Sequence, residues 1–162
     1  MSERIQHNVT VDAIVTRPAW IGGANPSHIQ VLLIQRGKEP FKGHWALPGG
    51  FVDRNENPVN AVVRELQEET GYRGAPDECE LVGVFGEPGR DPRGHVITIA
   101  YRVFLDPSQI QEAPRAGDDA ARAAWWPLNA LPPMAFDHFR ILQKAHPREH
   151  VAVAATRADA LQ

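Results

Sequence analysis

The sequence is poor in cysteine, has no long apolar run and carries no large excess of either charge. Cys79 is the single cysteine among 162 residues, which excludes an internal disulfide framework and a cysteine-rich zinc site. No apolar run approaches the roughly 20 residues that a membrane-spanning helix needs, and the N-terminus lacks the apolar segment of a signal peptide. The formal net charge of -3 does not indicate the basic face of a nucleic-acid-binding protein. We therefore expect a cytoplasmic protein that binds neither nucleic acid nor membrane.

The chain length and the glycine and proline punctuation predict a single domain over residues 1–162, with an alanine-rich tail at 147–162. Short apolar segments predict strands at residues 9–15, 29–34, 81–85, 96–105 and 123–126, with a loop at 18–27. The predicted helices are fewer and lie apart from one another. This pattern favours an α/β (α+β) fold in which helices cover a mixed β-sheet.

The clearest helix is predicted for residues 58–70, where apolar side chains recur at the i, i+3, i+4, i+7 spacing and form one stripe. Asn57 is a favourable N-cap, and Pro58 suits the first helical position. Gly71 is a natural residue for ending the helix. A second helix is predicted for residues 136–146, and the tail that follows it can be read as either helical or frayed.

Three carboxylates, those of Glu65, Glu68 and Glu69, stand at i, i+3 and i+4 on the first helix. They project into one sector beside the apolar stripe. Glu68 and Glu69 lie in the last turn, where a negative charge costs about 0.3–1 kcal/mol through the helix dipole. A divalent cation would offset this cost, and carboxylate oxygens suit Mg²⁺ or Mn²⁺. The alternative is a solvated acidic face on which Arg64 pairs with Glu68.

The stretch from Gly50 to Tyr72 resembles the Nudix box, whose pattern is G-x5-E-x7-R-E-U-x-E-E-x-G-U with U apolar or aromatic. The matching positions are Gly50, Glu56, Arg64, Glu65, Leu66, Glu68, Glu69, Gly71 and Tyr72. The resemblance implies a Nudix-type αβα sandwich with a central mixed β-sheet over about residues 7–146. It also implies a Nudix pyrophosphohydrolase, which hydrolyses a nucleoside diphosphate linked to another group.

The same resemblance implies a catalytic role for each charged residue of the box. Glu65, Glu68 and Glu69 are expected to bind Mg²⁺ or Mn²⁺. Arg64 is expected to orient Glu65, and Glu56 is expected to be a supporting carboxylate. Divalent cations are what a pyrophosphate requires, because they neutralise its charge, place the attacking water and stabilise the leaving oxygen.

A further carboxylate from a loop often serves as the general base in this superfamily. We favour Asp118 or Asp119, because related proteins place an extra acidic residue just before the strand predicted at 123–126. Glu112 and Glu87 are alternatives for this role. The other interpretation of this segment is a solvated acidic loop.

The substrate class is indicated by a basic turn in which Arg90 and Arg93 bracket an Asp-Pro pair. Guanidinium groups are well suited to bind phosphate oxygens. The RDPRGH segment resembles the ADP-ribose pyrophosphatase group of the Nudix superfamily, as do residues 40–52 and residues 136–138. The resemblance implies hydrolysis of ADP-ribose to AMP and ribose 5-phosphate. The candidate substrate-binding residues are Gly49, Gly50, Arg36, Arg90 and Arg93.

Other substrates and a non-enzymatic role stay open. A Nudix hydrolase for another nucleotide sugar or for a modified nucleoside triphosphate would share the box. The RDPRG signature also resembles Nudix-like regulators that sense ADP-ribose. Those regulators carry a C-terminal winged helix, for which the 16 residues after His146 are too few, and their boxes are often degraded, so we favour the enzyme. The resemblance also implies a homodimer, and it implies a small-molecule nucleotide diphosphate as the substrate.

Overall fold

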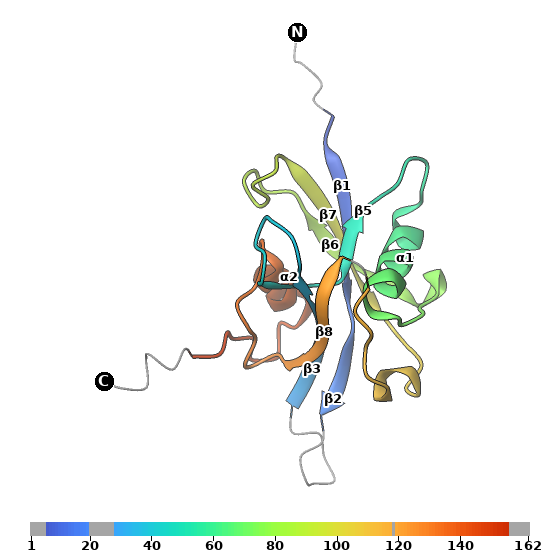
Figure 1. The fold of residues 1–162 in the computed structure, drawn as a ribbon, viewed down its shortest axis with the longest axis vertical. Helices are drawn as coiled ribbons and strands as arrows, with labels where there is room; N and C mark the ends of the chain where they lie inside the picture. The colour runs from blue at the N-terminus through green and yellow to red at the C-terminus, as the bar shows by residue number, and fades with distance from the viewer. Residues whose placement is uncertain (1–5, 20–27, 118, 156–162) are drawn as a thin grey trace, which may run out of the picture.

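The computed structural model describes residues 6–19, 28–117 and 119–155, and it arranges them as two β-sheets between two helices (Figure 1). The first sheet has the order β5-β1-β7-β6, and only its β1–β7 pair is parallel. Its strands are β1 (Asn8–Ile14), β5 (Gly49–Phe51), β6 (Cys79–Phe85) and β7 (Val96–Val103). The mixed α/β class and the sandwich of layers are as predicted from the sequence.

The second sheet is built around β3 (His28–Arg36), which pairs antiparallel with three other strands. Those strands are β2 (Thr16–Ala19), β4 (Trp45–Ala46) and β8 (Ala120–Pro127). Gln30 pairs with both β2 and β8, and Ile34 pairs with both β4 and β8. The strands β2 and β4 therefore share one edge of β3, and β8 occupies the other. The predicted central sheet is thus divided in two, and the chain passes from one sheet to the other at Val15, between β1 and β2.

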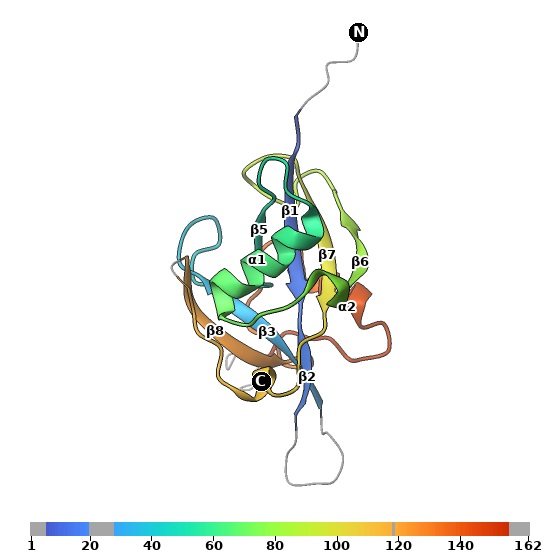
Figure 2. The same cartoon turned by 90° about the vertical axis from the view of Figure 1, so that its right-hand side faces the viewer.

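The helix α1 (Pro58–Thr70) has the predicted bounds and the predicted caps. The side chain of Asn57 accepts a hydrogen bond from the backbone N–H of Val59, and Gly71 ends the helix with φ 77°. The buried side chains of Val62 and Leu66 pack into a core with Val11 and Ala13 of β1 and Leu32 of β3. Figure 2 shows α1 lying across β1 and β5. This packing fixes the rotation of α1 and hence the direction of its carboxylates.

The helix α2 (His138–Ala145) covers the opposite side of the sheets and contributes Ile141 and Leu142 to a second core. It begins two residues later than predicted, because Phe136 adopts a left-handed backbone with φ 52°. Beyond α2, residues 151–155 run extended and hydrogen-bond to Leu128 and Leu131. Two short 3₁₀ helices, Pro76–Glu78 and Gln109–Gln111, complete the described elements. No helix of the described residues is long and apolar enough to cross a membrane.

The buried residue His146, which follows α2, predicts a pH-dependent stability. Burial lowers the pKa of this imidazole, and the nearby Arg102 cation lowers it further. A histidine whose pKa is lower in the folded state stabilises the fold above its unfolded pKa of about 6.5, and this contribution is lost as the pH falls below that value. We therefore expect His146→Gln to lose less unfolding free energy than the wild type between pH 7.5 and pH 5.5 in urea titrations. Equal losses in the two proteins would contradict this assignment.

Candidate functional site

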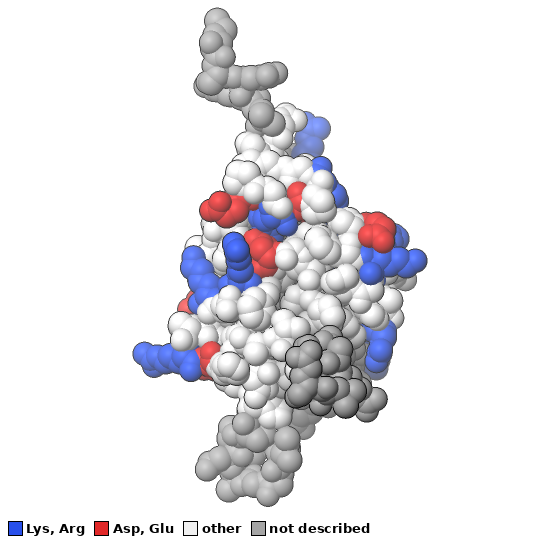
Figure 3. All heavy atoms as spheres, turned by 90° about the vertical axis from the view of Figure 1, so that its left-hand side faces the viewer, with Lys and Arg blue, Asp and Glu red and all other residues white. Residues whose placement is uncertain are grey.

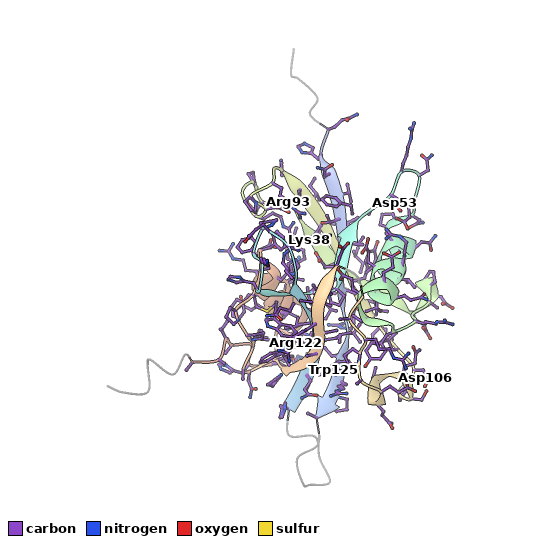
Figure 4. The ribbon with its side chains drawn as sticks, in the orientation of Figure 1. Lys38, Asp53, Arg93, Asp106, Arg122 and Trp125 are labelled. Atoms are coloured by element: carbon purple, nitrogen blue, oxygen red, sulfur yellow. The ribbon has the colours of Figure 1, made fainter. Side chains whose placement is uncertain are left out.

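A cavity of about 360 Å³ lies where β1, β3, β5, α1 and the loops before β7 and α2 converge. Figure 4 shows Lys38, Asp53 and Arg93, which line this cavity, in the upper half of the molecule, and Asp106 well away from it. The predicted site residues that line the cavity are Arg36, Gly49, Gly50, Glu65, Glu69, Arg90, Arg93 and Asp119. Glu56, Arg64 and Glu68 lie beside it without lining it, and Asp118 falls outside the described residues.

Arg64 connects two carboxylates on the α1 side of the cavity. Its guanidinium donates to both oxygens of Glu56 at 2.8 and 2.9 Å, and to Glu65 Oε1 at 2.6 Å. The hydrogen bonds from Arg64 lower the pKa of Glu56 to about 2, so Glu56 is ionised at neutral pH. This geometry is the one expected if Arg64 orients Glu65 and Glu56 supports Arg64.

Gly50 allows the Glu65 carboxylate to lie directly against the backbone of β5. A Cβ atom added at Gly50 would lie 2.5 Å from Glu65 Cδ, which is far closer than two carbon atoms can approach. The neighbouring Gly49 donates its backbone N–H to Glu69 Oε2 at 3.0 Å. The two glycines thus place backbone in contact with two of the three box carboxylates.

The surroundings of Glu65 and Glu69 disfavour the ionised forms of both carboxylates, chiefly because the two groups are buried. Burial raises the pKa of Glu69 to about 8, with smaller contributions from the negative charges of Glu65 and Asp12. Burial also raises the pKa of Glu65, although Arg64 opposes this shift. Glu68 differs, since its side chain is 60% exposed and its nearest ionic partner is Arg64 at 3.5 Å. A bound cation would stabilise the ionised forms of Glu65 and Glu69.

The donor chemistry of this wall fits a hard divalent cation. Carboxylate oxygens are the preferred ligands of Mg²⁺ and Mn²⁺. Within residues 6–19, 28–117 and 119–155, no three acidic, histidine or cysteine side chains already converge closely enough to enclose an ion. Glu65 and Glu69 are nevertheless available at the cavity, and Glu68 lies one turn from Glu65 on the same helix. These three residues are therefore the ones that could hold the cation.

The opposite wall of the cavity carries guanidinium groups stacked on aromatic rings. The Arg36 guanidinium lies 4.8 Å from the ring centre of Phe136, and the Arg93 guanidinium lies 5.4 Å from Phe136 and 5.1 Å from Phe51. Burial lowers the pKa of Arg36, and the neighbouring Arg93 cation lowers it further. Two cations held this close favour an anionic ligand.

Arg90 and Arg93, which the sequence pairs as substrate ligands, lie in different environments. The Arg90 side chain is only 4% exposed and forms a two-pronged ion pair with Asp137, with N–O distances of 2.7 and 3.0 Å. Arg93 is 39% exposed and is held by Asp91, which accepts bonds from its Nε and Nη2 atoms. The donors of Arg90 are thus occupied by protein, whereas Arg93 reaches the cavity surface.

Asp119 lies at the cavity rim in an exposed ion pair with Lys38, at 2.5 Å. The hydrogen bond and positive charge of Lys38 lower the pKa of Asp119, which favours its ionised form. Glu87 and Glu112, the other candidates for a general base, do not line the cavity.

Four buried polar residues of the cavity, Thr10, Asp12, Asp91 and His138, are absent from the sequence-based set of site residues. The sequence carries a signal for Asp12, because it is the one acidic residue within the apolar strand β1. Such a residue, 5% exposed, requires polar partners. His138 lies in the 136–138 segment that resembles the ADP-ribose pyrophosphatase group, but its hydrogen-bond partner is far away in the sequence, so the segment alone does not show what the imidazole contacts.

A model of the NUDIX domain matches residues 7–145. An ADP-ribose pyrophosphatase from Methanocaldococcus jannaschii is 47% identical over 114 residues, which are 70% of this chain and 64% of that protein. An ADPR responsive transcriptional repressor, NtrR, from Acinetobacter baylyi is 36% identical over 139 residues, which are 83% of this chain and 54% of that protein.

Among solved structures, the NUDIX domain of Shewanella oneidensis NrtR complexed with ADP ribose superposes with a TM-score of 0.73 at 30% identity. The match covers 90% of each chain. The present chain spans less than two thirds of the length of both curated relatives. The matched family model, the Nudix box on α1 and the sandwich fold together show that the chain belongs to the Nudix family.

Proposed function

We propose that the protein is a metal-dependent pyrophosphohydrolase that converts ADP-ribose and water to AMP and ribose 5-phosphate. One observation carries this proposal: a single cavity has carboxylates on one wall and guanidinium groups on the other. Glu65 and Glu69 would hold a divalent cation, which would neutralise the charge of a diphosphate, and Arg36 and Arg93 would bind the phosphate oxygens. The similarity to an ADP-ribose pyrophosphatase and to an ADP-ribose-bound domain supports ADP-ribose as the substrate.

Glu65, Glu68 and Glu69 would hold Mg²⁺ or Mn²⁺ in this proposal. When bound, the cation neutralises the diphosphate and polarises its oxygens. Arg64 keeps the Glu65 carboxylate in one orientation, and the Gly49 N–H does the same for Glu69. The protein thus holds the ligand carboxylates in place before substrate arrives, which lowers the cost of reorganisation during the reaction.

Arg36 and Arg93 bind the diphosphate oxygens, and Gly49 and Gly50 let the substrate approach the backbone closely. Arg90 acts through its ion pair with Asp137, which anchors the loop that carries Arg93. Asp119 or Asp118 accepts the proton of the attacking water. The ion pair between Lys38 and Asp119 favours the carboxylate form that a general base requires.

A second candidate function is an ADP-ribose-binding sensor, which the similarity to an ADPR responsive transcriptional repressor and to a NUDIX domain complexed with ADP ribose favours. The box supports the enzyme, since all three carboxylates and Arg64 are present.

We propose no nucleic-acid partner, because basic and acidic side chains are interspersed on the face that Figure 3 shows. A homodimer is supported by Leu81 and Val84, which are each 58% exposed on β6 at the end of the first sheet. A cytoplasmic location suits a chain with one cysteine.

We expect Glu68→Gln to lower kcat by about 100-fold or more, because even residues that only support metal ligands contribute up to about 100-fold. The fold should be unaffected, since this side chain is exposed and contacts Arg64 alone among charged groups. Gln67→Ala, at the exposed neighbouring position, is the matched control and should retain wild-type kinetics. A Glu68→Gln protein with the wild-type rate in saturating Mg²⁺ would contradict the metal assignment.

Gly50→Ala tests the contact between β5 and Glu65. The new methyl group would force the Glu65 carboxylate to move, and a misplacement of about 1 Å in a reacting geometry can cost about 100-fold in rate. We expect kcat to fall to this extent while circular dichroism shows a folded protein. Gly86→Ala is the control, because its added Cβ would meet no atom closer than Ile97 Cγ1 at 3.4 Å. Equal rates for the two variants would refute the proposed contact.

The substrate is tested by measuring kcat/KM with Mg²⁺ and with Mn²⁺ for ADP-ribose, ADP-glucose, NADH, diadenosine polyphosphates and nucleoside triphosphates. We expect ADP-ribose to lead by about tenfold or more, within the range that pocket contacts provide. The products should be AMP and ribose 5-phosphate. A different leading substrate would retain the hydrolase and reject ADP-ribose. Calorimetric binding of ADP-ribose without turnover of any compound would establish the sensor instead.

A further inference from the structure

The buried imidazole of His138 contacts the segment that leads into the glycine pair. Its Nδ1 atom accepts the backbone N–H of Leu47 at 3.0 Å, although the two residues are 91 positions apart. Burial lowers the pKa of His138, so the ring is neutral, and acceptance at Nδ1 places its single proton on Nε2. Nε2 lies 3.4 Å from Asp12 Oδ1. The ring therefore joins β1 to the segment before β5.

Asp12 is fixed from its other side by β7. Its Oδ2 atom accepts the hydroxyl of Thr98 at 2.5 Å, and both residues are buried. Asp12 is also the strand partner of Gly49 in the β1–β5 pair, and the N–H of the next residue, Ala13, bonds to Pro48 O at 2.7 Å. The Thr98–Asp12–His138 chain thus lies directly against the segment from Leu47 to Gly50.

Neighbouring atoms lie in direct contact with the two glycines of this segment. A Cβ atom at Gly49 would lie 2.0 Å from the carbonyl oxygen of Val11, and one at Gly50 would meet the Glu65 carboxylate. The Gly49 N–H holds Glu69 on the far side. A displacement of Leu47 would therefore shift Gly49 and Gly50, and with them the Glu65 and Glu69 carboxylates that face the cavity.

We propose that His138 is a positioning residue for the hydrolysis, acting chiefly through Leu47 to hold Gly49 and Gly50 against Glu65 and Glu69. This inference rests on the proposed function, and it assigns no contact between His138 and the substrate. The preceding residue, Asp137, holds Arg90 and hence the phosphate-binding loop. The two adjacent residues therefore support opposite walls of the cavity.

The test compares two replacements of His138 that keep different atoms of the ring. His138→Asn retains an acceptor near the position of Nδ1, whereas His138→Gln retains a polar atom near the position of Nε2 and leaves the Leu47 N–H without its acceptor. We expect kcat to fall about 10- to 100-fold in the glutamine variant, with KM for ADP-ribose changed less than about threefold. The asparagine variant should recover kcat to within about threefold of the wild type. His146→Gln, which removes the other buried histidine, is the control and should keep wild-type kinetics.

Amide hydrogen exchange gives a readout that does not depend on catalysis. We expect the Leu47 and Gly49 amides to exchange faster in His138→Gln than in wild type or His138→Asn, with α1 unchanged. Unaltered Leu47 exchange, a wild-type kcat in His138→Gln, or equal losses in the two variants would each overturn the positioning role. Failure of the wild-type protein to hydrolyse ADP-ribose would refute the proposed function instead, and the exchange measurement would then decide the role of His138.

Discussion

The site depends on holding two carboxylates together in a partly buried position against their own repulsion. Glu65 and Glu69 both have raised pKa values, which means that the folded structure disfavours their ionised forms. Two local features oppose this, the Arg64 guanidinium and the Gly49 N–H, and the absence of a side chain at Gly50 leaves room for Glu65. The contacts with Gly49 and Gly50 require α1 to have one rotation and one height relative to β5. The buried apolar stripe of α1 supplies that constraint.

The signals for α1 are local, and this is why its bounds could be predicted to the residue. Asn57, Pro58 and Gly71 act on their immediate neighbours, and the apolar spacing decides which face is buried. The strands β2, β4 and β5 were not predicted. Their sequences are short or rich in glycine, and each exists because it pairs with another strand. Such pairing overrides local β-propensity.

The same distinction separates the predictable part of the site from the rest. The box residues lie within 23 positions, so their spacing on one helix and one turn could be recognised without knowing the fold. The partners of Asp12 and His138 are 86 and 91 positions away, and only the tertiary structure brings them together. Arg90 shows why a motif alone can mislead. Its guanidinium binds Asp137, 47 positions away, and the sequence of the turn that contains Arg90 gives no sign of this ion pair.

Residues 136–138 adopt a strained backbone that allows their side chains to contact the residues around the cavity. Phe136 adopts φ 52°, a conformation that costs a residue with a Cβ atom about 1–2 kcal/mol. This conformation lets three consecutive side chains make three different contacts around the cavity. Phe136 stacks on Arg36, Asp137 binds Arg90 and His138 accepts from Leu47. A regular helix starting at Phe136 would place consecutive side chains about 100° apart around one axis. The delayed start of α2 therefore follows from the contacts that this segment makes with the cavity walls.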